Sequence, residues 1–598
     1  MSSINSPMTL AKSDIFIKRS GMKLQNRKLM TMSSGYLYPF ACIEVLPGDT
    51  FNLDTTFLTR MNTPIHPTMG DAYQDIFWFY VPNRIVMDRW KEFLGESPKD
   101  KYLNPVEYTL PRWDGHLGEE YGPVPFKSIL DYLGYPAGNI VPEINSLKIR
   151  GFCQIWNEYF RDQNLQNAID VQTDQSTVNL SQAVGSSVFN PELPTGYLAL
   201  ENYYAGSTPD FYVTSSAAGG VLPPVNKLHD LFTSATLEAQ KGDPVPIPAV
   251  SFNSEWLPVM ARSSQVYDDD SLGLLQPLNY AVIQDSQNDE SLSLLSNGQT
   301  GVNGYSSGYS QDSFFSSQGD ITPSNLWAKT SSSDANAYAS INDLRYAFAL
   351  QSFLETDNRY GTRYRELIFG HYRVQTKDAS IQIPEFLAHK RYRIGMSQVV
   401  QNSATNDVSP QGNLAAYSLT TDSDRYFLKS FEEHGFVFGV TCIRTHNSYE
   451  QAIDKSSLYK TKLDFYFPEF ASIGDQPIRV PEVWNDNQNG LSEPPVYWEQ
   501  FFGFQEAWYQ YRYLPDTVSG EFRSNYLTSL NYWTYGNNFV NQPYLSDGFI
   551  RQDRSLIDRT LASNDPSSDQ FLCDFYVSIN AVRPLPIYSM GATLKGAF

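Results

Sequence analysis

Short apolar runs, each closed by a turn signal, are the dominant pattern along this chain. The segment Asp75–Val81 (DIFWFYV) is almost entirely apolar and ends at Pro82-Asn83, which is typical of a strand buried on both faces. Similar runs recur in both halves of the chain. The clearest are Tyr36–Val45, Phe51–Leu58, Asp75–Val81, Phe436–Ile443, Leu463–Phe467 and Phe571–Ile579. Each run is predicted to form a β-strand.

Helical periodicity is confined to a few segments. Residues 84–95 (RIVMDRWKEFLG) can place Trp90 and Phe93 on one face and end at a glycine, which suits a helix terminus. Residues 147–166 space their aromatic side chains three to four positions apart, including Trp156 and Phe160. Residues 343–356 repeat the pattern. We therefore predict three amphipathic helices.

Composition supports a mainly β fold. The 598 residues include 37 Gly, 36 Pro and 14% aromatics, but only 18% charged residues. This mixture suits many short strands joined by long loops, and it excludes a helical bundle or a disordered chain because so many aromatics can bury a large core. There is no internal repeat at a solenoid or propeller period.

Charge is distributed unevenly. The formal net charge of −21 argues against a dedicated nucleic-acid-binding protein. Of the 44 Lys and Arg residues, however, 17 lie in residues 1–161, 4 in 162–344 and 23 in 345–598. Residues 1–35 are polar and basic and are predicted to form an arm rather than a packed element; a frayed, solvated terminus is the alternative interpretation. The basic residues of this arm are Lys12, Lys18, Arg19, Lys23, Arg27 and Lys28.

The middle of the chain is a chemically distinct window. Residues 163–226 and 263–328 contain no Lys or Arg, and residues 286–333 are dense in Ser, Asn, Gly and Gln. A flexible linker is one interpretation. We favour an ordered insertion with an exposed outer surface, because long loops in compact proteins usually carry function and this one retains aromatics that can pack. These include Tyr305, Tyr309, Phe314, Phe315 and Trp327.

The sequence offers no catalytic or metal-binding motif. Residues 304–308 match G-x-S-x-G, but their Gly- and Ser-rich flanks lack the strand and helix that hold a hydrolase nucleophile. The seven histidines form no H-E-x-x-H motif and do not pair with cysteines. The acidic run 268–270 lacks the spaced ligands of a calcium loop. We predict no catalytic site, no cofactor and no metal.

The remaining chemistry points to a soluble, reduced protein. Cys42, Cys153, Cys442 and Cys573 are widely separated and are predicted to be buried thiols. No run of about 18 apolar residues occurs, and the N-terminus lacks a signal-peptide pattern, so we expect no membrane insertion.

A series of short blocks runs from residue 46 to residue 586. They are LPGDTF (46–51), IFWFYVPNR (76–84), WKEFLGE (90–96), IWNEYFRDQNL (155–165), KLHDLFTS (227–234), QKG (240–242), INDLR (341–345), GTRY (361–364), PEFL (384–387), FGFQEAW (502–508), YRY (511–513), VSGEFR (518–523) and VRPLP (582–586). Together, and in this order, they resemble the major capsid proteins of small single-stranded DNA bacteriophages, the gokushovirus branch of the Microviridae. The stretch between residues 165 and 227 is longer than is usual in that family, and the tip of the central window matches none of its blocks.

The resemblance implies a fold and an assembly. The expected fold is an eight-stranded viral jelly roll with long loop insertions and a few short helices. The expected assembly is a T=1 icosahedral shell, built from pentamers, around circular single-stranded DNA. A small basic DNA-binding virion protein, a pilot protein and a host surface receptor are the other partners that it implies. The protein is expected in the virion, after assembly in the cytoplasm of a bacterial host.

The resemblance and the charge pattern together divide the chain. Residues 1–35 are predicted to be an internal basic arm, and residues 36–166, 227–249 and 339–598 to build the jelly-roll body. Residues 167–226 are predicted to be an extended surface insertion and residues 250–338 an outward protrusion near the threefold axes.

Three groups of residues follow from this division. We expect DNA to meet the six basic residues of the arm, because phosphates need Lys and Arg. We expect a host receptor to meet the aromatics of the protrusion named above, because tyrosines can bind sugars or proteins. The body is expected to bury or pack Trp78, Trp90, Trp156, Phe160 and Trp508.

Two other classes remain open at this stage. An all-β glycan-binding surface protein would explain the aromatics and the acidity, although it predicts a signal peptide. A glycoside hydrolase needs two carboxylates facing each other across a cleft, and sequence spacing alone does not exclude such a pair.

Overall fold

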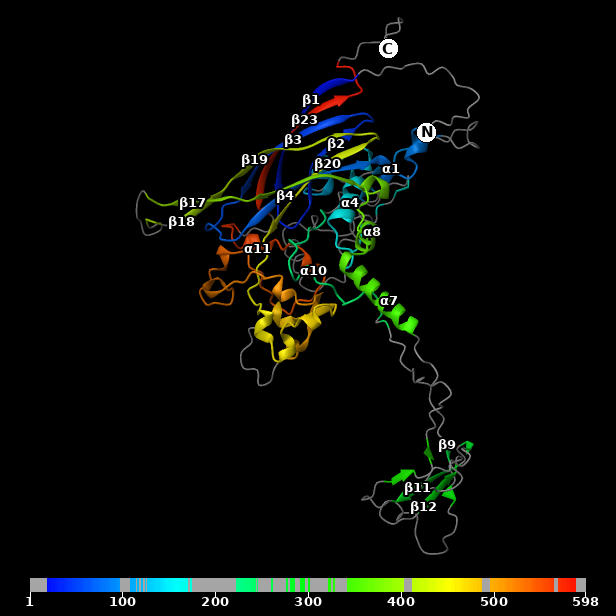
Figure 1. The fold of residues 1–598 in the computed structure, drawn as a ribbon. Helices are drawn as coiled ribbons and strands as arrows, with labels where there is room; N and C mark the ends of the chain where they lie inside the picture. The colour runs from blue at the N-terminus through cyan, green and yellow to red at the C-terminus, as the bar shows by residue number, and fades with distance from the viewer. Residues whose placement is uncertain are drawn as a thin grey trace, which may run out of the picture. The chain divides into compact units, whose positions relative to one another are not determined.

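A computed structural model describes residues 19–96, 108–113, 126–169, 222–243, 341–402, 414–486, 495–563 and 568–587, with short stretches between these ranges. The chain divides into two compact units (Figure 1). Unit 1 comprises residues 1–241 and 354–598, and unit 2 comprises residues 242–353. The predicted protrusion, residues 250–338, falls inside unit 2.

Two four-stranded antiparallel sheets form the body of unit 1 (Figure 1). One has the order β1-β23-β3-β19 and the other β16-β4-β20-β2. The eight strands are β1 (Ser20–Met32), β2 (Tyr38–Val45), β3 (Thr50–Met61), β4 (Ala72–Pro82), β16 (Glu385–Arg393), β19 (Thr420–Ser430), β20 (Gly435–Thr445) and β23 (Phe571–Arg583). Among these eight, successive strands alternate between the sheets except at β4 and β16, which are neighbours. This is a jelly roll, and it confirms the predicted fold class.

Two long insertions interrupt the jelly roll. Residues 83–384 separate β4 from β16, and residues 446–570 separate β20 from β23. The helices lie in these insertions: α1 (Asn83–Val86), α2 (Trp90–Phe93), α3 (Ile129–Leu133), α4 (Leu147–Tyr159), α7 (Ile341–Tyr360), α8 (Tyr364–Tyr372), α9 (Asp378–Ile381), α10 (Asp547–Ile550) and α11 (Ser555–Asp558). The remaining small strands of unit 1 form the pairs β5–β8 (Arg112–Trp113, Ile144–Asn145), β6–β7 (His116–Leu117, Glu120–Tyr121), β17–β18 (Met396–Val400, Leu414–Ser418) and β21–β22 (Asp475–Arg479, Phe501–Glu506).

The main hydrophobic core lies between the two sheets. Phe40 of β2 contacts Trp78 of β4 edge-on, with ring centroids 5.2 Å apart, and stacks on Phe575 of β23 at 4.4 Å. Gly439 of β20 is required here, because a Cβ atom would come within 2.6 Å of Phe40 and 2.9 Å of Trp78. Aromatic rings from both sheets therefore interlock in the core.

Helix α4 covers the outer face of the second sheet beside β4 and β20 (Figure 1). Gly151 permits this close approach, because a Cβ atom there would lie 2.9 Å from Phe438 and 3.6 Å from Val81. The aromatic stripe of α4 meets the sheet through Tyr159, whose ring lies 4.7 Å from that of Phe79. β4 and β20 are consequently buried on both faces, as the apolar runs predicted.

The second insertion forms its own smaller core. Its buried apolar residues come from residues 231–232, 449, 478–484, 502–509 and 545–550. Residues 227–236, which were assigned to the body from sequence, pack here: Phe232 meets Tyr449 edge-on at 4.8 Å.

Two sequence predictions of elements are wrong. The run Leu463–Phe467 contains no strand; it begins in a 3-10 helix, Lys462–Asp464, and its apolar side chains are exposed. A short apolar run cannot be distinguished from a strand by its pattern when no pairing partner is known. Residues 84–95 form two single-turn helices rather than one: Met87 between them has extended backbone, and the next residue, Asp88, is hydrogen-bonded to Thr173.

The predicted arm also needs correction, because residues 20–32 are the strand β1, paired along its length with β23. One side of β1 carries Met30 and Met32 into the core, while the opposite side is exposed and, apart from Leu29, mostly polar. That one-sided burial gives the segment the polar composition of an arm. Residues 1–18 lie outside the described residues.

Unit 2 contains two small antiparallel sheets among the residues that are described. One has the order β10-β9-β15 (Gln276–Pro277, Met260–Ala261, Leu326–Trp327). The other has the order β13-β12-β11-β14 (Thr300–Gly301, Ser291–Leu295, Tyr280–Asp285, Ile321–Pro323).

Candidate functional site

The end of helix α4 is the meeting point of several sequence blocks. Arg363, of the GTRY block, donates from its guanidinium to the carbonyl oxygens of Asn157 (2.8 Å) and Arg161 (3.0 Å). Asn157 lies in the last turn of α4, where no residue within the helix can satisfy its carbonyl, and Arg161 follows just after the helix ends. Arg363 therefore caps the helix with a planar, charged fork, for which lysine is a poor substitute.

Tyr159 connects the same helix to the start of β16. Its hydroxyl donates to the carbonyl oxygen of Pro384 at 2.6 Å, in the PEFL block, and lies 3.1 Å from Asp378. Arg365 lies over the Tyr159 ring, 4.8 Å from its centroid. The blocks IWNEYFRDQNL, GTRY and PEFL thus form one contact, although some 200 residues separate them in sequence.

A second set of contacts joins the first and last of the sequence blocks, LPGDTF and VRPLP. In the LPGD turn, Asp49 accepts hydrogen bonds from the backbone N–H of Leu46 (2.8 Å) and from Nε of Arg583 (3.0 Å). Asp49 is fully buried, and Gly48 adopts the positive φ of +91° that the turn requires. The turn between β2 and β3 is therefore held by the last residue of β23.

The third cluster is a buried carboxylate on the outer face of the second sheet. Asp75 is fully buried, and its oxygens accept hydrogen bonds from His389 (2.8 Å), Arg391 (2.7 Å) and Arg444 (3.0 Å). Burial alone would raise the pKa of Asp75. The hydrogen bond from His389 and the charges of Arg444 and Arg391 outweigh burial, so the pKa lies well below its usual range.

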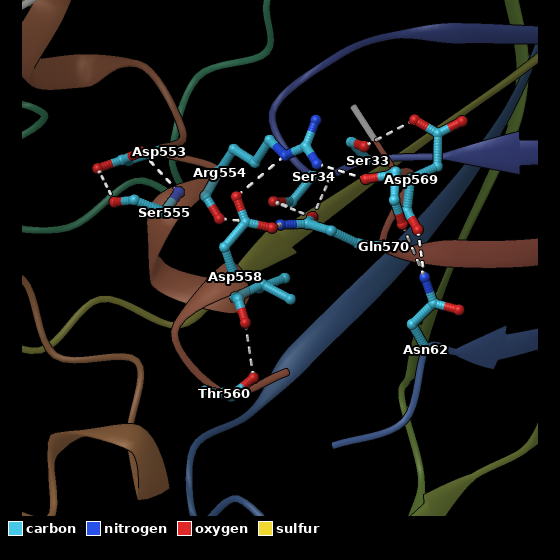
Figure 2. Close-up of polar contacts among 12 residues, drawn as sticks. Ser33, Ser34, Asn62, Asp553, Arg554, Ser555, Asp558, Thr560, Asp569 and Gln570 are labelled. Carbon is cyan, nitrogen blue, oxygen red and sulfur yellow. Dashed lines mark hydrogen bonds and ion pairs between the residues drawn. The ribbon is translucent and has the colours of Figure 1, made fainter. Parts of the chain in front are cut away.

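A fourth network seals the second insertion against the jelly roll (Figure 2). The Gln570 amide accepts from the backbone N–H of Ser34 (2.8 Å) and donates to the carbonyl of Arg554 (2.9 Å) and to Asp558 (2.6 Å). Asp569, next to it, accepts from Ser33 Oγ at 3.0 Å. Gln570 is fully buried and both ends of its amide are bonded, so this network is a structural seam.

None of these clusters presents a reactive group. Burial raises the pKa of the Cys153, Cys442 and Cys573 thiols to about 12, so none is a thiolate at neutral pH. Cys42 is half-buried. Within the described part of the chain, no three His, Cys, Asp or Glu side chains gather in a way that could hold a metal ion. Nor is any helix there long and apolar enough to cross a membrane. The clusters hold segments together.

The open face of the first sheet is the candidate nucleic-acid interface. Residues directly opposite each other in antiparallel strands lie on the same face, so the register assigns Lys23, Arg27, Arg60 and Arg425 to this side of β1, β3 and β19. All four are exposed. Arg27 is engaged by a bidentate ion pair with Asp574 (2.9 and 2.5 Å).

Hydrogen-bonding side chains fill the rest of this face. They include Gln25, Asn52, Thr56, Ser423, Tyr576, Ser578 and Asn580, and two carboxylates, Asp54 opposite Arg425 and Asp574, lie among them. The exposed apolar side chains on this face are Leu29, Leu428, Leu572 and Val582. A face with unpaired cations, amides and an aromatic ring offers contacts to phosphates, sugars and bases.

Lys28 is a correction to the predicted DNA-facing set. Its side chain points away from the open face, and its ammonium group donates to the carbonyl oxygens of Pro39 (3.0 Å) and Tyr132. Burial lowers its pKa to about 8. Alternation along β1 explains the difference, because Arg27 and Lys28 are neighbours in sequence and therefore point to opposite sides of the sheet.

The other predicted residues divide into described and undescribed ones. Trp78, Trp156 and Trp508 are buried, and Trp90 and Phe160 are half-buried against the main core. Arg19 is exposed, whereas Lys12 and Lys18 lie outside the described residues. The same is true of Tyr305, Tyr309, Phe314 and Phe315, and of the side chain of Trp327 in β15.

Sequence reasoning missed Asp75, Gln570, Arg60 and Arg425. A charged residue opening the apolar run DIFWFYV is a visible signal for Asp75. For the other three no local signal exists, because their placement depends on strand register and on contacts between distant segments.

An eight-stranded jelly roll with long insertions is an architecture that viral capsid proteins share with lectin domains, so the fold defines a class of β-proteins but not a function. Comparison with known proteins identifies the family. The chain belongs to the capsid protein (F protein) family of phages, whose model matches residues 13–593. The resemblance to gokushovirus capsid proteins is thereby confirmed.

Three relatives align along nearly their whole length. The chain is 33% identical to capsid protein VP1 of Chlamydia phage 1, over 96% of this chain and 95% of the relative. It is 30% identical to capsid protein VP1 of Spiroplasma virus 4 (96% and 95%) and 31% identical to that of Bdellovibrio phage phiMH2K (93% and 92%). The chain is thus a major capsid protein of the Microviridae type and a component of the virion. This replaces the glycan-binding and hydrolase alternatives.

Proposed function

We propose that copies of this chain assemble through pentamers into a T=1 icosahedral shell that encloses a circular single-stranded DNA genome. Membership of the capsid family over residues 13–593, together with a complete eight-stranded jelly roll, supports this proposal. A closed shell uses repeated, symmetric contacts between copies, so most functional residues are contact residues. Assembly would take place in the cytoplasm of a bacterial host, with a small basic DNA-binding protein and a pilot protein as further virion components.

The decisive experiment is the size and content of purified particles. We expect electron microscopy to show uniform small icosahedral shells, with pentamers as the smaller species, and nuclease treatment to leave circular single-stranded DNA inside the shells. A monomeric protein, or shells whose enclosed nucleic acid is double-stranded, would contradict the proposal.

The open face of the first sheet is proposed to meet the genome, together with the arm that precedes it. Lys23, Arg60 and Arg425 on this face have exposed side chains, and Arg19 stands at the entrance to β1. Each phosphate contact that replaces a condensed counterion strengthens binding at low salt. The chain's net charge of −21 would otherwise repel DNA, so a local cationic face is needed on the inner side.

Neutralising the basic residues of the arm and β1 is expected to reduce the DNA content of particles. The variant carries glutamine at Lys12, Lys18, Arg19, Lys23 and Arg27. Loss of five positive charges should lower DNA per particle about two-fold or more and make its retention more sensitive to salt. The measurement is the ratio of absorbance at 260 nm to that at 280 nm of sized particles.

A matched variant tests whether position, rather than total charge, matters. It carries glutamine at five other exposed basic residues, Arg89, Lys91, Lys241, Arg345 and Lys377. Its particles should package DNA as the unaltered protein does. Equal packaging by both variants would sink the assignment of DNA contacts to the arm and β1.

Residues 250–338 are proposed to project from the shell and to bind a host surface receptor. Two observations support this: the segment is almost free of Lys and Arg, and it lies in a unit of its own, residues 242–353. An acidic, Ser- and Asn-rich surface stays soluble, and its tyrosines can bind sugars or proteins. Residues 167–226 are proposed to be a second surface insertion.

A further inference from the structure

The segment 455–474 exposes a row of large apolar side chains. Leu463, Phe465, Tyr466, Phe467 and Phe470 are exposed there, and Tyr511 lies beside them, 6.3 Å from Tyr466 between ring centroids. We call these six residues the aromatic ledge. The ledge includes the run Leu463–Phe467, for which the sequence predicts a strand. In the structure the apolar side chains of this run are exposed instead of buried in a sheet.

Hydrogen bonds, rather than burial, fix the shape of the ledge. Three short 3-10 helices, Lys455–Leu458, Lys462–Asp464 and Pro468–Phe470, build the segment, and none of them contains a buried residue. The Asp464 carboxylate accepts the backbone N–H groups of Lys460 (2.8 Å) and Thr461 (2.6 Å). Trp508 Nε1 donates to the carbonyl of Phe470 at 2.7 Å. The apolar side chains are therefore presented on a preorganised backbone and are not used by the chain's own core.

The exposed apolar area is large for a free surface. The six side chains are 40–59% exposed. With 150–250 Å² for each aromatic side chain, this leaves roughly 600 Å² of apolar surface. That value is at the upper limit of about 300–600 Å² for the largest patch on a monomer, and it approaches the ~800 Å² that each partner contributes to a stable interface.

The border of the ledge has the composition of an interface rim. Lys460, Lys462 and Glu469 are exposed around it, with charges of both signs. An apolar, aromatic centre within a polar rim is the usual anatomy of a protein–protein contact. A nucleic-acid platform would instead need a uniformly basic surround, and a sugar site would need free polar groups, whereas Asp464 is already bonded to its own backbone.

We propose that the aromatic ledge is a contact between subunits and is covered by a second copy of this chain. The inference rests on the proposed shell function, because a capsid protein must bury part of its surface against copies of itself. The area, the preorganised backbone and the mixed-charge rim all match a second protein chain, and the partner present at the highest local concentration in a shell is another copy.

The first test replaces ledge residues that make few internal contacts. The variant Leu463→Lys/Phe467→Lys places two charges in the centre of the proposed contact. We expect it to fold normally, by circular dichroism and thermal melting, and to raise the protein concentration needed for assembly at least tenfold. The control, Leu527→Lys/Val540→Lys, changes two apolar residues that are 97% and 90% exposed on other segments, and it should assemble as the unaltered protein does.

The second test measures protection directly. Covalent footprinting of residues 463–470 should fall several-fold between the free chain and assembled, DNA-free particles of the unaltered protein. Equal labelling in both states would overturn the proposal, whatever the variants do. Protection that appears only in DNA-filled particles would overturn it too and would assign the ledge to the genome. Failure of the unaltered chain to assemble at all would instead count against the shell function itself.

Discussion

Replacing Asp75 with asparagine is expected to lower the free energy of unfolding of the jelly roll by about 3–5 kcal/mol. Asp75 is fully buried and accepts hydrogen bonds from two arginines and a histidine. Arg444 is also well shielded, with 13% of its side chain exposed, so its positive charge would lose its partner inside the sheet. An asparagine keeps the shape but not the charge. Denaturant titration followed by tryptophan fluorescence measures the change.

The loss of stability caused by Asp75→Asn should depend on pH, and the direction of that dependence follows from the lowered pKa of Asp75. The pKa of Asp75 is lowered on folding, so its ionisation stabilises the folded state above the unfolded-state pKa of about 3.9. That contribution is lost as the pH falls from there towards the lower folded-state pKa. The difference in stability between the unaltered protein and Asp75→Asn should therefore shrink as the pH falls below about 4.

A control for this prediction lies four residues earlier. Asp71 forms an ion pair with Arg393, in which the two side chains are 33% and 69% exposed. Surface pairs of this kind contribute about 0–1 kcal/mol, so Asp71→Asn should change stability by less than 1 kcal/mol. If both substitutions cost the same, the buried cluster does not stabilise the sheet in the way described.

Removing the central insertion is expected to abolish host adsorption while leaving assembly intact. The backbone N–H of Lys241 lies 3.4 Å from the carbonyl oxygen of Leu354, so a short Gly-Ser linker can replace residues 242–353 and join these ends. The deletion removes the predicted protrusion, residues 250–338, together with residues 242–249 and 339–353, which belong to unit 2 although the sequence assigned them to the body. Unit 1 keeps both sheets and both cores. The adsorption rate of particles to a permissive bacterial host should fall by two orders of magnitude or more.

A second variant distinguishes the loss of receptor-binding side chains from the loss of the whole insertion. It keeps the insertion but carries serine at the receptor-facing candidates Tyr305, Tyr309, Phe314, Phe315 and Trp327. Particles of this variant should assemble normally and adsorb at least tenfold more slowly. Loss of shells with adsorption retained by the remaining particles would contradict the assignment of this insertion to host attachment.

Strands that are buried on both faces could be predicted from the sequence better than segments that are wholly or partly exposed. Runs such as Asp75–Val81 and Phe436–Ile443 identified β4 and β20 because a strand buried on both faces is apolar throughout. β1 was assigned to an arm because only one of its faces is buried. For Leu463–Phe467 the sequence predicts a strand, because an apolar run does not show whether its side chains are buried or exposed.

The functional assignments divide in the same way. Ordered blocks from LPGDTF to VRPLP indicated the capsid family, and the comparisons confirmed it. The arm is predicted to contact DNA because its six basic residues lie close together in the sequence. Strand register determines which side chains lie on the same side of a sheet. Only the register showed that Lys28 points away from the open face of the first sheet and that Arg60 and Arg425 lie on it.

The sequence by itself determined the class of fold, the family and the acidic central window, since composition, apolar runs and ordered blocks are all local in the chain. Tertiary structure alone decided the alternation of strands between two sheets, the capping of α4 by Arg363 and the burial of Asp75. It also separated the exposed apolar ledge from the core. These features arise from contacts between residues hundreds of positions apart, whose free energy depends on packing and desolvation rather than on local sequence.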